Sequence, residues 1–146
     1  MAKVVSVNIS REKGVIKTPV DLVVLTKDHG LEQDAHAGDW HRQVSLLGIE
    51  SVEKIKEMGM DNLSPGVFAE NILTQGIVLH QLPVGTWLRV GETIHEVTQI
   101  GKECHQRCEI FHTVGDCVMP REGIFTRVIQ GGRVKAGDVV EVMETI

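Results

Sequence analysis

The stretch TWLRVGETIHEVTQI at residues 86–100 decides which fold we expect. Two short runs that contain β-branched residues, Thr86–Val90 and Thr93–Ile100, flank the dipeptide Gly91-Glu92. Runs of this kind are typical of strands, and a two-residue link that contains glycine predicts a tight hairpin between them. The middle of the chain therefore indicates a β-rich protein.

Further strands are expected on both sides of this hairpin. From Val5 to Ile9 apolar and polar side chains alternate, which is the period of a half-buried strand. Other short apolar runs are bounded by glycine, proline or polar residues. The strands expected outside the hairpin are Lys3–Ile9, Val15–Lys17, Leu22–Leu25, Gln43–Leu47, Val67–Ile72, Gly76–Leu79, Val134 and Val139–Met143.

Two segments carry helix signals. Ile49–Met58 places apolar residues at every third position, has glutamates in its first turn, and is followed by Gly59. Pro120–Gln130 begins with a proline, which suits the first helical position, and ends at Gly131-Gly132. We therefore expect a helix over each of these segments.

These elements predict a mainly β fold: a closed mixed β-barrel with a few short helices, because closure removes exposed strand edges. The length of 146 residues fits a single domain over residues 1–146. Hydrophobic residues make up 42% of the chain, whereas aromatic residues make up only 3%. The core is therefore expected to consist of Val, Ile and Leu.

Charge and cysteine content limit the partners and the compartment. A net charge of −5 argues against non-specific binding to nucleic acid or to anionic membranes. No apolar run approaches the roughly 20 residues that span a bilayer, and the N-terminus lacks the pattern of a signal peptide. The three cysteines are an odd number, which disfavours a disulfide framework. These features predict a cytoplasmic protein that binds neither nucleic acid nor a membrane.

The first polar cluster is DAHAGDWHRQ at residues 34–43, which leads into an expected strand. It contains His36, His41 and Arg42, and histidine and arginine together can hold a phosphate. Loops that carry such side chains next to a rigid strand often form sites. The alternative is a solvated loop in which Gly38 provides a turn.

The second polar cluster spans residues 102–121 and holds all three cysteines. Cysteine acts as a nucleophile or a metal ligand only as the thiolate, which neighbouring positive charge favours. Arg107 directly precedes Cys108, and Arg121 follows in the same cluster. Cys108 is therefore the candidate catalytic and metal-binding residue, whereas the alternative is that the cysteines are small buried hydrophobic residues.

Two other interpretations of the cysteines stay open. Cys104, Cys108, His112 and Cys117 could hold zinc, although their spacing is looser than that of most structural zinc sites. A disulfide between Cys104 and Cys108 would suit a redox sensor. The sequence contains no phosphate-binding loop, dinucleotide-binding fingerprint, nucleophile elbow or zincin motif, so the common enzymes built on these motifs are disfavoured.

Several stretches resemble motifs of one family. They are DAHAG at 34–38 with HRQVSLL at 41–47, GVFAEN at 66–71, LPVGT at 82–86, GKECHQRC at 101–108 and GDCVMPREG at 115–123. In this order they are similar to small standalone bacterial members of the MOSC domain family, the domain found at the C-terminus of molybdenum cofactor sulfurases. The chain departs from the family pattern at Gln33 and Ala69, where the family usually has glycine, which tolerates positive φ.

The resemblance implies a β-barrel related to that of pyruvate kinase, and it implies that the cofactor is molybdenum cofactor, a pterin dithiolene with a phosphate. Cys108 fits the position of the family's functional cysteine, which would carry sulfur as a persulfide or ligate molybdenum. The residues expected to line the cofactor site are His36, His41, Arg42, Arg107, Arg121 and Asn71. For Asn71, in a buried polar pair with Glu70, the alternative is a structural role in orienting the backbone.

Three functions remain in competition. In the first, the protein binds molybdenum cofactor and acts as a sulfurtransferase-like enzyme or as a molybdenum-dependent oxidoreductase that reduces N-hydroxylated compounds. In the second, it is a non-enzymatic molybdopterin carrier or chaperone. In the third, it is a small zinc-stabilised structural protein. Because the chain has no pyridoxal-phosphate-binding domain, any sulfur must come from a sulfur-donor protein. The sequence does not fix an oligomeric state.

Overall fold

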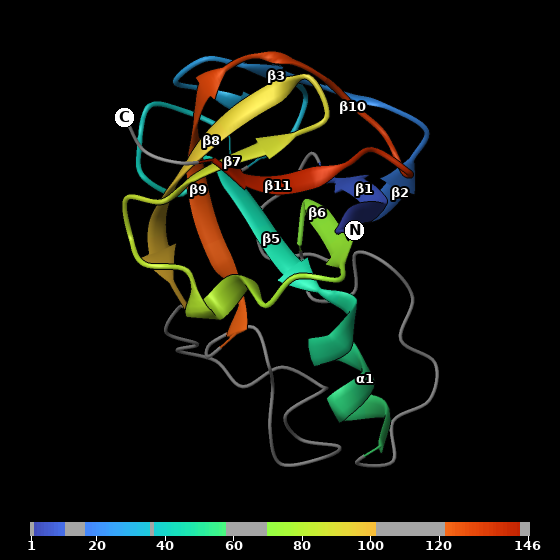
Figure 1. Ribbon diagram of the computed structural model, residues 1–146. Helices are drawn as coiled ribbons and strands as arrows, with labels where there is room; N and C mark the ends of the chain where they lie inside the picture. Colours follow the sequence, from blue (N-terminus) through green and yellow to red (C-terminus); the bar gives the residue numbers. More distant parts are fainter. Residues whose placement is uncertain (1, 11–16, 36, 58–69, 102–121, 144–146) are drawn as a thin grey trace.

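The computed structural model describes residues 2–10, 17–35, 37–57, 70–101 and 122–143 of the chain, and Figure 1 shows how they are arranged. These residues form two β-sheets with very little helix. The elements in chain order are β1 (Lys3–Ile9), β2 (Thr18–Val20), β3 (Val23–Thr26), β4 (Gly30–Leu31), β5 (Val44–Gly48), α1 (Ile49–Glu57), β6 (Ile72–Gln75), the 3₁₀ turn η1 (Leu79–Gln81), β7 (Trp87–Val90), β8 (Thr93–Ile100), β9 (Ile124–Gln130), β10 (Gly132–Val134) and β11 (Val140–Met143).

The expected hairpin is confirmed as the antiparallel pair β7–β8, with Val90 opposite Thr93 across the turn. Gly91 has a φ of 56°, and a Cβ atom there would lie 2.5 Å from a carboxylate oxygen of Asp138. Only glycine therefore fits this turn without a shift of its neighbour. From this hairpin the large sheet extends in the order β11-β7-β8-β9-β5-β6-β1-β2, and β10-β3-β4 form a separate small sheet.

The parallel pair in the large sheet is β5–β6, in which Leu46 lies opposite Ile72. A parallel pair needs a crossover connection, and α1 begins directly after β5, within that connection. All five residues of β5 are buried, and β9 pairs with β5 on its other edge, so β5 lies inside the sheet. In Figure 1, α1 and the β10-β3-β4 sheet lie at opposite ends of the molecule.

The prediction of a closed barrel is wrong, because the described strands form open mixed sheets. The end strands of the large sheet, β11 and β2, do not pair with each other. Within the described residues, the β11 side meets β1 through one isolated bridge, between Lys3 and Val139, where closure would need a ladder. The free edge of β2 is protected in part by Pro19, which has no N–H to offer a further strand.

The prediction of a second helix is also wrong: Ile124–Gln130 is strand β9, which pairs with β5 and β8. Four of its seven residues are β-branched, which favours a strand, and pairing along both edges fixes it inside the large sheet. Its first three residues are all buried, and buried and less buried residues alternate only after them, so the strand gives no clear period of two. The tertiary environment, and not the flanking Pro120 and Gly131, determines the secondary structure of this segment.

Smaller differences concern the ends of elements. The expected helix from Ile49 is confirmed as α1, and the expected strands Lys3–Ile9 and Thr93–Ile100 are confirmed with the same bounds as β1 and β8. The strand expected at 76–79 is absent, and η1 begins at Leu79. Strand β4 was not expected, since two residues give no periodic signal.

The core is aliphatic, as the composition predicts. Its buried members are valines, leucines and isoleucines from both sheets, among them Val7, Leu25, Leu46, Leu88 and Val128. Burial of such side chains is the main force that holds the sheets together. In the described part of the chain, no helix has the length and apolar character needed to cross a membrane.

The side chain of His95, in β8, is titratable and fully buried. Its Nε2 lies 2.8 Å from the hydroxyl of Thr93, and its Nδ1 lies 2.8 Å from the hydroxyl of Thr126. Thr93 donates its own hydrogen to the carbonyl of Val90, so it accepts from Nε2 of His95. The ring is therefore held neutral with its proton on Nε2, and burial lowers the pKa of His95 from 6.5 to about 4.

We predict that His95 makes stability depend on pH. Because its pKa is lower in the folded than in the unfolded state, its contribution is complete above pH 6.5 and is lost as the pH falls from 6.5 towards about 4. The loss reaches about 3 kcal/mol, at about 1.4 kcal/mol for each pKa unit. Urea unfolding at several pH values checks this, with His95→Gln as the control that cannot titrate. An equally steep pH dependence in both proteins would contradict the assignment.

Candidate functional site

A row of neighbouring residues crosses the large sheet, with one residue in each of β8, β9, β5 and β1 and one directly before β6. Gln99 of β8 lies opposite Phe125 of β9, and Phe125 lies opposite Ser45 of β5. The row continues through backbone hydrogen bonds from Asn71 to Ser45 and from Asn8 to Asn71. We call these five residues, Gln99, Phe125, Ser45, Asn71 and Asn8, the cross-sheet row. It places side chains from distant parts of the chain along one line.

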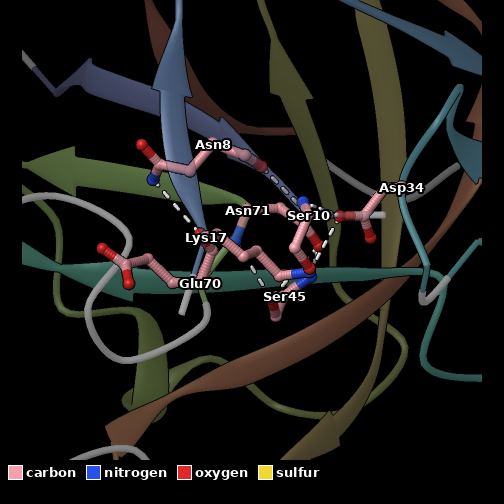
Figure 2. Close-up of polar contacts among 7 residues, drawn as sticks. All are labelled: Asn8, Ser10, Lys17, Asp34, Ser45, Glu70 and Asn71. Atoms are coloured by element: carbon pink, nitrogen blue, oxygen red, sulfur yellow. Dashed lines mark hydrogen bonds and ion pairs between the residues drawn. The ribbon is translucent and has the colours of Figure 1, made fainter. Parts of the chain in front are cut away.

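Asn71 connects three strands within the cross-sheet row. Its Oδ1 accepts hydrogen bonds from the backbone N–H of Ser45 at 3.0 Å and from the Ser45 hydroxyl at 3.1 Å. Its Nδ2 donates to the carbonyl of Asn8 at 3.2 Å, and the Asn8 side chain donates to the carbonyl of Glu70 (Figure 2). Asn71 is fully buried, so these bonds orient the backbones of β1, β5 and β6.

A buried ion pair lies beside the Asn8 end of the cross-sheet row. Nζ of Lys17 is 2.8 Å from Oδ1 of Asp34, and neither side chain is exposed to solvent. The same Asp34 oxygen accepts the backbone N–H of Ser10 at 3.1 Å (Figure 2). Sequence reasoning included Asp34 in the first polar cluster but missed Lys17, because a lone lysine beside a strand gives no signal of a partner 17 residues away.

His41 contacts the other end of the cross-sheet row. The side-chain nitrogen of Gln99 donates to the carbonyl of Gly101 at 2.8 Å, so the Gln99 oxygen faces His41. His41 Nε2 therefore donates to this oxygen, at 3.0 Å. The carbonyl of His41 also accepts a hydrogen bond from the hydroxyl of Thr98. Side chain and backbone together hold this expected site residue against the end of β8.

Arg42 lies between two aromatic rings. Its guanidinium carbon is 5.8 Å from the ring centre of Trp40 and 5.5 Å from that of Phe125. Such stacking stabilises the cation. The Nε of Arg42 is buried, with no hydrogen-bond partner among the described residues. A buried donor without a partner is costly, so the arrangement is suited to an anionic group that supplies an acceptor.

The two ends of the segment that contains the cysteines meet close to His41 and Arg42. The N–H of Gly101 donates to the carbonyl of Gly123 at 2.6 Å, at the point where β8 ends and β9 is about to begin. The expected site residues Cys108, Arg107 and Arg121 lie outside the described residues, as does His36. Of the expected site residues in the described part, His41 and Arg42 lie at this point, and Asn71 lies further along the cross-sheet row.

Sequence reasoning also missed Glu122. Its Oε1 accepts hydrogen bonds from the Ser51 hydroxyl at 2.7 Å and from Lys54 Nζ at 2.8 Å, and His80 lies 3.9 Å away. Burial raises the pKa of Glu122, but the hydrogen bonds from Lys54 and Ser51 and the charges of Lys54 and His80 outweigh burial, so the pKa falls below its usual value. Together with Gly48, Glu50 and Ile77–Leu79, these residues line a cavity of about 150 Å³.

Gln33, which stands where the family usually has glycine, lies in a turn. Gln33 adopts a φ of 68°, in the left-handed region where the family's glycine would carry no strain. It directly precedes Asp34 of the buried ion pair. The turn is therefore kept in this chain even though its residue is not glycine.

Comparisons with known proteins show the family and the fold. The model of the MOSC domain family matches residues 33–141. Among solved structures, the YuaD protein of Bacillus subtilis superposes with a TM-score of 0.79 at 20% identity, over 97% of this chain and 96% of that chain. YiiM of Geobacillus stearothermophilus gives 0.75 at 21% identity, over 99% and 76% of the two chains, and YiiM of Escherichia coli gives 0.70 at 22%, over 100% and 71%. A search of curated proteins found no match.

We predict that Asn71→Ala lowers the free energy of unfolding by about 3 kcal/mol or more, because several buried donors and acceptors lose their partner at once. Ser45→Ala removes only a hydroxyl and is expected to cost about 1 kcal/mol. Denaturant titration of both variants measures the difference. Equal destabilisation would show that the Asn71 side chain does not connect the strands.

We predict that Gln33→Gly stabilises the protein by about 0.5–1 kcal/mol. Removal of the left-handed strain is worth about 1–2 kcal/mol, from which the extra chain entropy of glycine subtracts. Gln33→Ala is the matched control, since it shortens an exposed side chain and keeps the strain. If the glycine variant is no more stable than the alanine variant, the turn carries no strain.

Proposed function

Because the chain belongs to the MOSC domain family, we propose that it binds molybdenum cofactor where the segment 37–43 meets the end of β8 and the beginning of β9. One observation carries this proposal: His41 and Arg42 contact Gln99 and Phe125, on either side of the joined residues Gly101 and Gly123. Cys108 belongs to the segment that begins and ends at this point.

The described residues fit an anionic cofactor. Arg42 offers a buried Nε that has no partner among the described residues, and the stacked rings keep its guanidinium in place. Arginine is the side chain best suited to a phosphate, because its planar group can form two parallel hydrogen bonds. Arg42 and His41 would hold the cofactor, with His36, Arg107 and Arg121 completing the set, whereas the buried amide of Asn71, also expected there, bonds to Ser45 and Asn8.

Cys108 is proposed as the group that acts chemically. As a thiolate it is a soft ligand for molybdenum and a good nucleophile. In sulfur transfer, the thiolate attacks the terminal sulfur of a donor protein's persulfide, the donor leaves as a thiol, and Cys108 becomes a persulfide. Bound molybdenum would instead supply the two electrons needed to reduce an N-hydroxylated compound. A carrier function would use the same site without turnover.

We predict that Arg42→Gln weakens binding of molybdopterin by about tenfold or more, which matches the loss of one charge-assisted hydrogen bond. Arg89→Gln, on β7 away from the cross-sheet row, is expected to bind like the wild type. Equilibrium binding to the apo-protein, followed by pterin fluorescence, measures both. If Arg42→Gln keeps wild-type affinity, the site is not at this end of the sheet.

The role of Cys108 has its own test. Mass spectrometry after incubation with a persulfide donor is expected to show one added sulfur atom on the wild-type protein and none on Cys108→Ser. Cys104→Ser and Cys117→Ser are the matched controls and should still gain the sulfur. Retention of sulfur transfer and of cofactor binding in Cys108→Ser would contradict the assignment.

A further inference from the structure

The ion pair between Lys17 and Asp34 is fully buried. Both side chains are inaccessible to solvent, and their atoms are 2.8 Å apart. Removal of two charges from water costs several kcal/mol per ion, and well-packed hydrophobic residues in the same place are often at least as stable. A buried pair of this kind suggests that its role is to hold the neighbouring segments in place.

The pair connects three segments that are distant in sequence. Ser10 directly follows β1, Lys17 directly precedes β2, and Asp34 begins the first polar cluster. Asp34 accepts the Ser10 N–H, and Lys17 Nζ lies 3.5 Å from the Ser10 hydroxyl. Backbone bonds add to these contacts, since Ala35 donates to the Ser10 carbonyl at 2.7 Å. The start of the cluster is thus fixed to the end of β1.

The same cluster is fixed again at its other end. Ala37 donates to the Asp34 carbonyl, and Gly38 donates to the His29 carbonyl at 2.7 Å. A few residues later, His41 and Arg42 contact Gln99 and Phe125. The segment 37–43 therefore lies between the ion pair at one end and the end of β8 at the other.

We propose that Lys17 and Asp34 are positioning residues, which set the segment 37–43 so that His41 and Arg42 face the ligand. The cofactor part of this inference rests on the proposed function, whereas the placement of His41 does not. Neither residue needs to touch the ligand. Their effect is on where the imidazole and the guanidinium lie.

The test uses the double variant Lys17→Met with Asp34→Leu, which removes both charges of this pair at once. Each single variant is expected to lower Tm by roughly 10 °C, whereas the double variant should lie within a few degrees of the wild type. The matched control is Arg89→Met with Glu141→Leu, which removes an exposed pair 3.7 Å apart between β7 and β11. Lys17→Gln with Asp34→Asn serves in its place if the apolar pair does not fold.

Two readouts separate positioning from stability. The first is the ¹⁵N and ¹H shifts of the His41 ring in the apo-protein, which report its hydrogen bond to Gln99. In the folded double variant they should move to the values of a histidine that lacks this hydrogen bond, and they should stay unchanged in the control. The second is molybdopterin affinity, which should fall roughly tenfold or more.

The outcomes are distinct. Unchanged His41 shifts in a folded double variant would overturn the proposal and leave the pair as a structural contact only. If the wild type binds no molybdopterin, the proposed function fails, and the His41 shifts still decide the positioning role. Altered His41 shifts with wild-type affinity would overturn the link between this pair and the ligand.

Discussion

The hydrogen bonds of the Asn71 side chain are the constraint on which the rest of the structure depends. Strands β5 and β6 run parallel, so no tight turn sets their register. A slip of one residue would turn every side chain to the opposite face. The Asn71 amide prevents such a slip, because it bonds the backbone of Ser45 on one side and that of Asn8 on the other. Strands β1, β5 and β6 are thereby fixed at one offset.

That offset determines which residues meet at the end of the sheet. Ser45 lies opposite Phe125, and Phe125 lies opposite Gln99, so the register set by Asn71 extends to the residues that His41 and Arg42 contact. The ion pair of Lys17 with Asp34 adds a second fixed point next to Asn8 (Figure 2). In a chain with a net charge of −5, these contacts keep a guanidinium and an imidazole together in one place. A local site that can bind an anion is compatible with a protein of negative net charge.

Local patterns in the sequence predicted the local features of the structure. The hairpin at Gly91, the bounds of β1 and β8, and the start of α1 at Ile49 each follow from signals within a few residues. His41 and Arg42 both lie near the end of β8, whereas the role of the expected site residues stays a prediction. Segment 124–130 was predicted wrongly, because the first residues of this strand are buried without alternation and its neighbours favoured a helix. The barrel was predicted wrongly, because closure depends on pairing between the two end strands, which no local pattern encodes. Lys17 was missed for a similar reason, since its partner lies in another segment.

We propose that this MOSC domain holds molybdenum cofactor next to His41, Arg42 and the segment that contains the cysteines. The most direct measurement is the metal and pterin content of the protein purified from a molybdenum-replete host. If the cofactor binds there, we expect molybdenum and pterin in equal amounts, close to one of each per chain, with no zinc. Protein that carries neither molybdenum nor pterin, or that carries stoichiometric zinc and unfolds when the zinc is chelated, would contradict it.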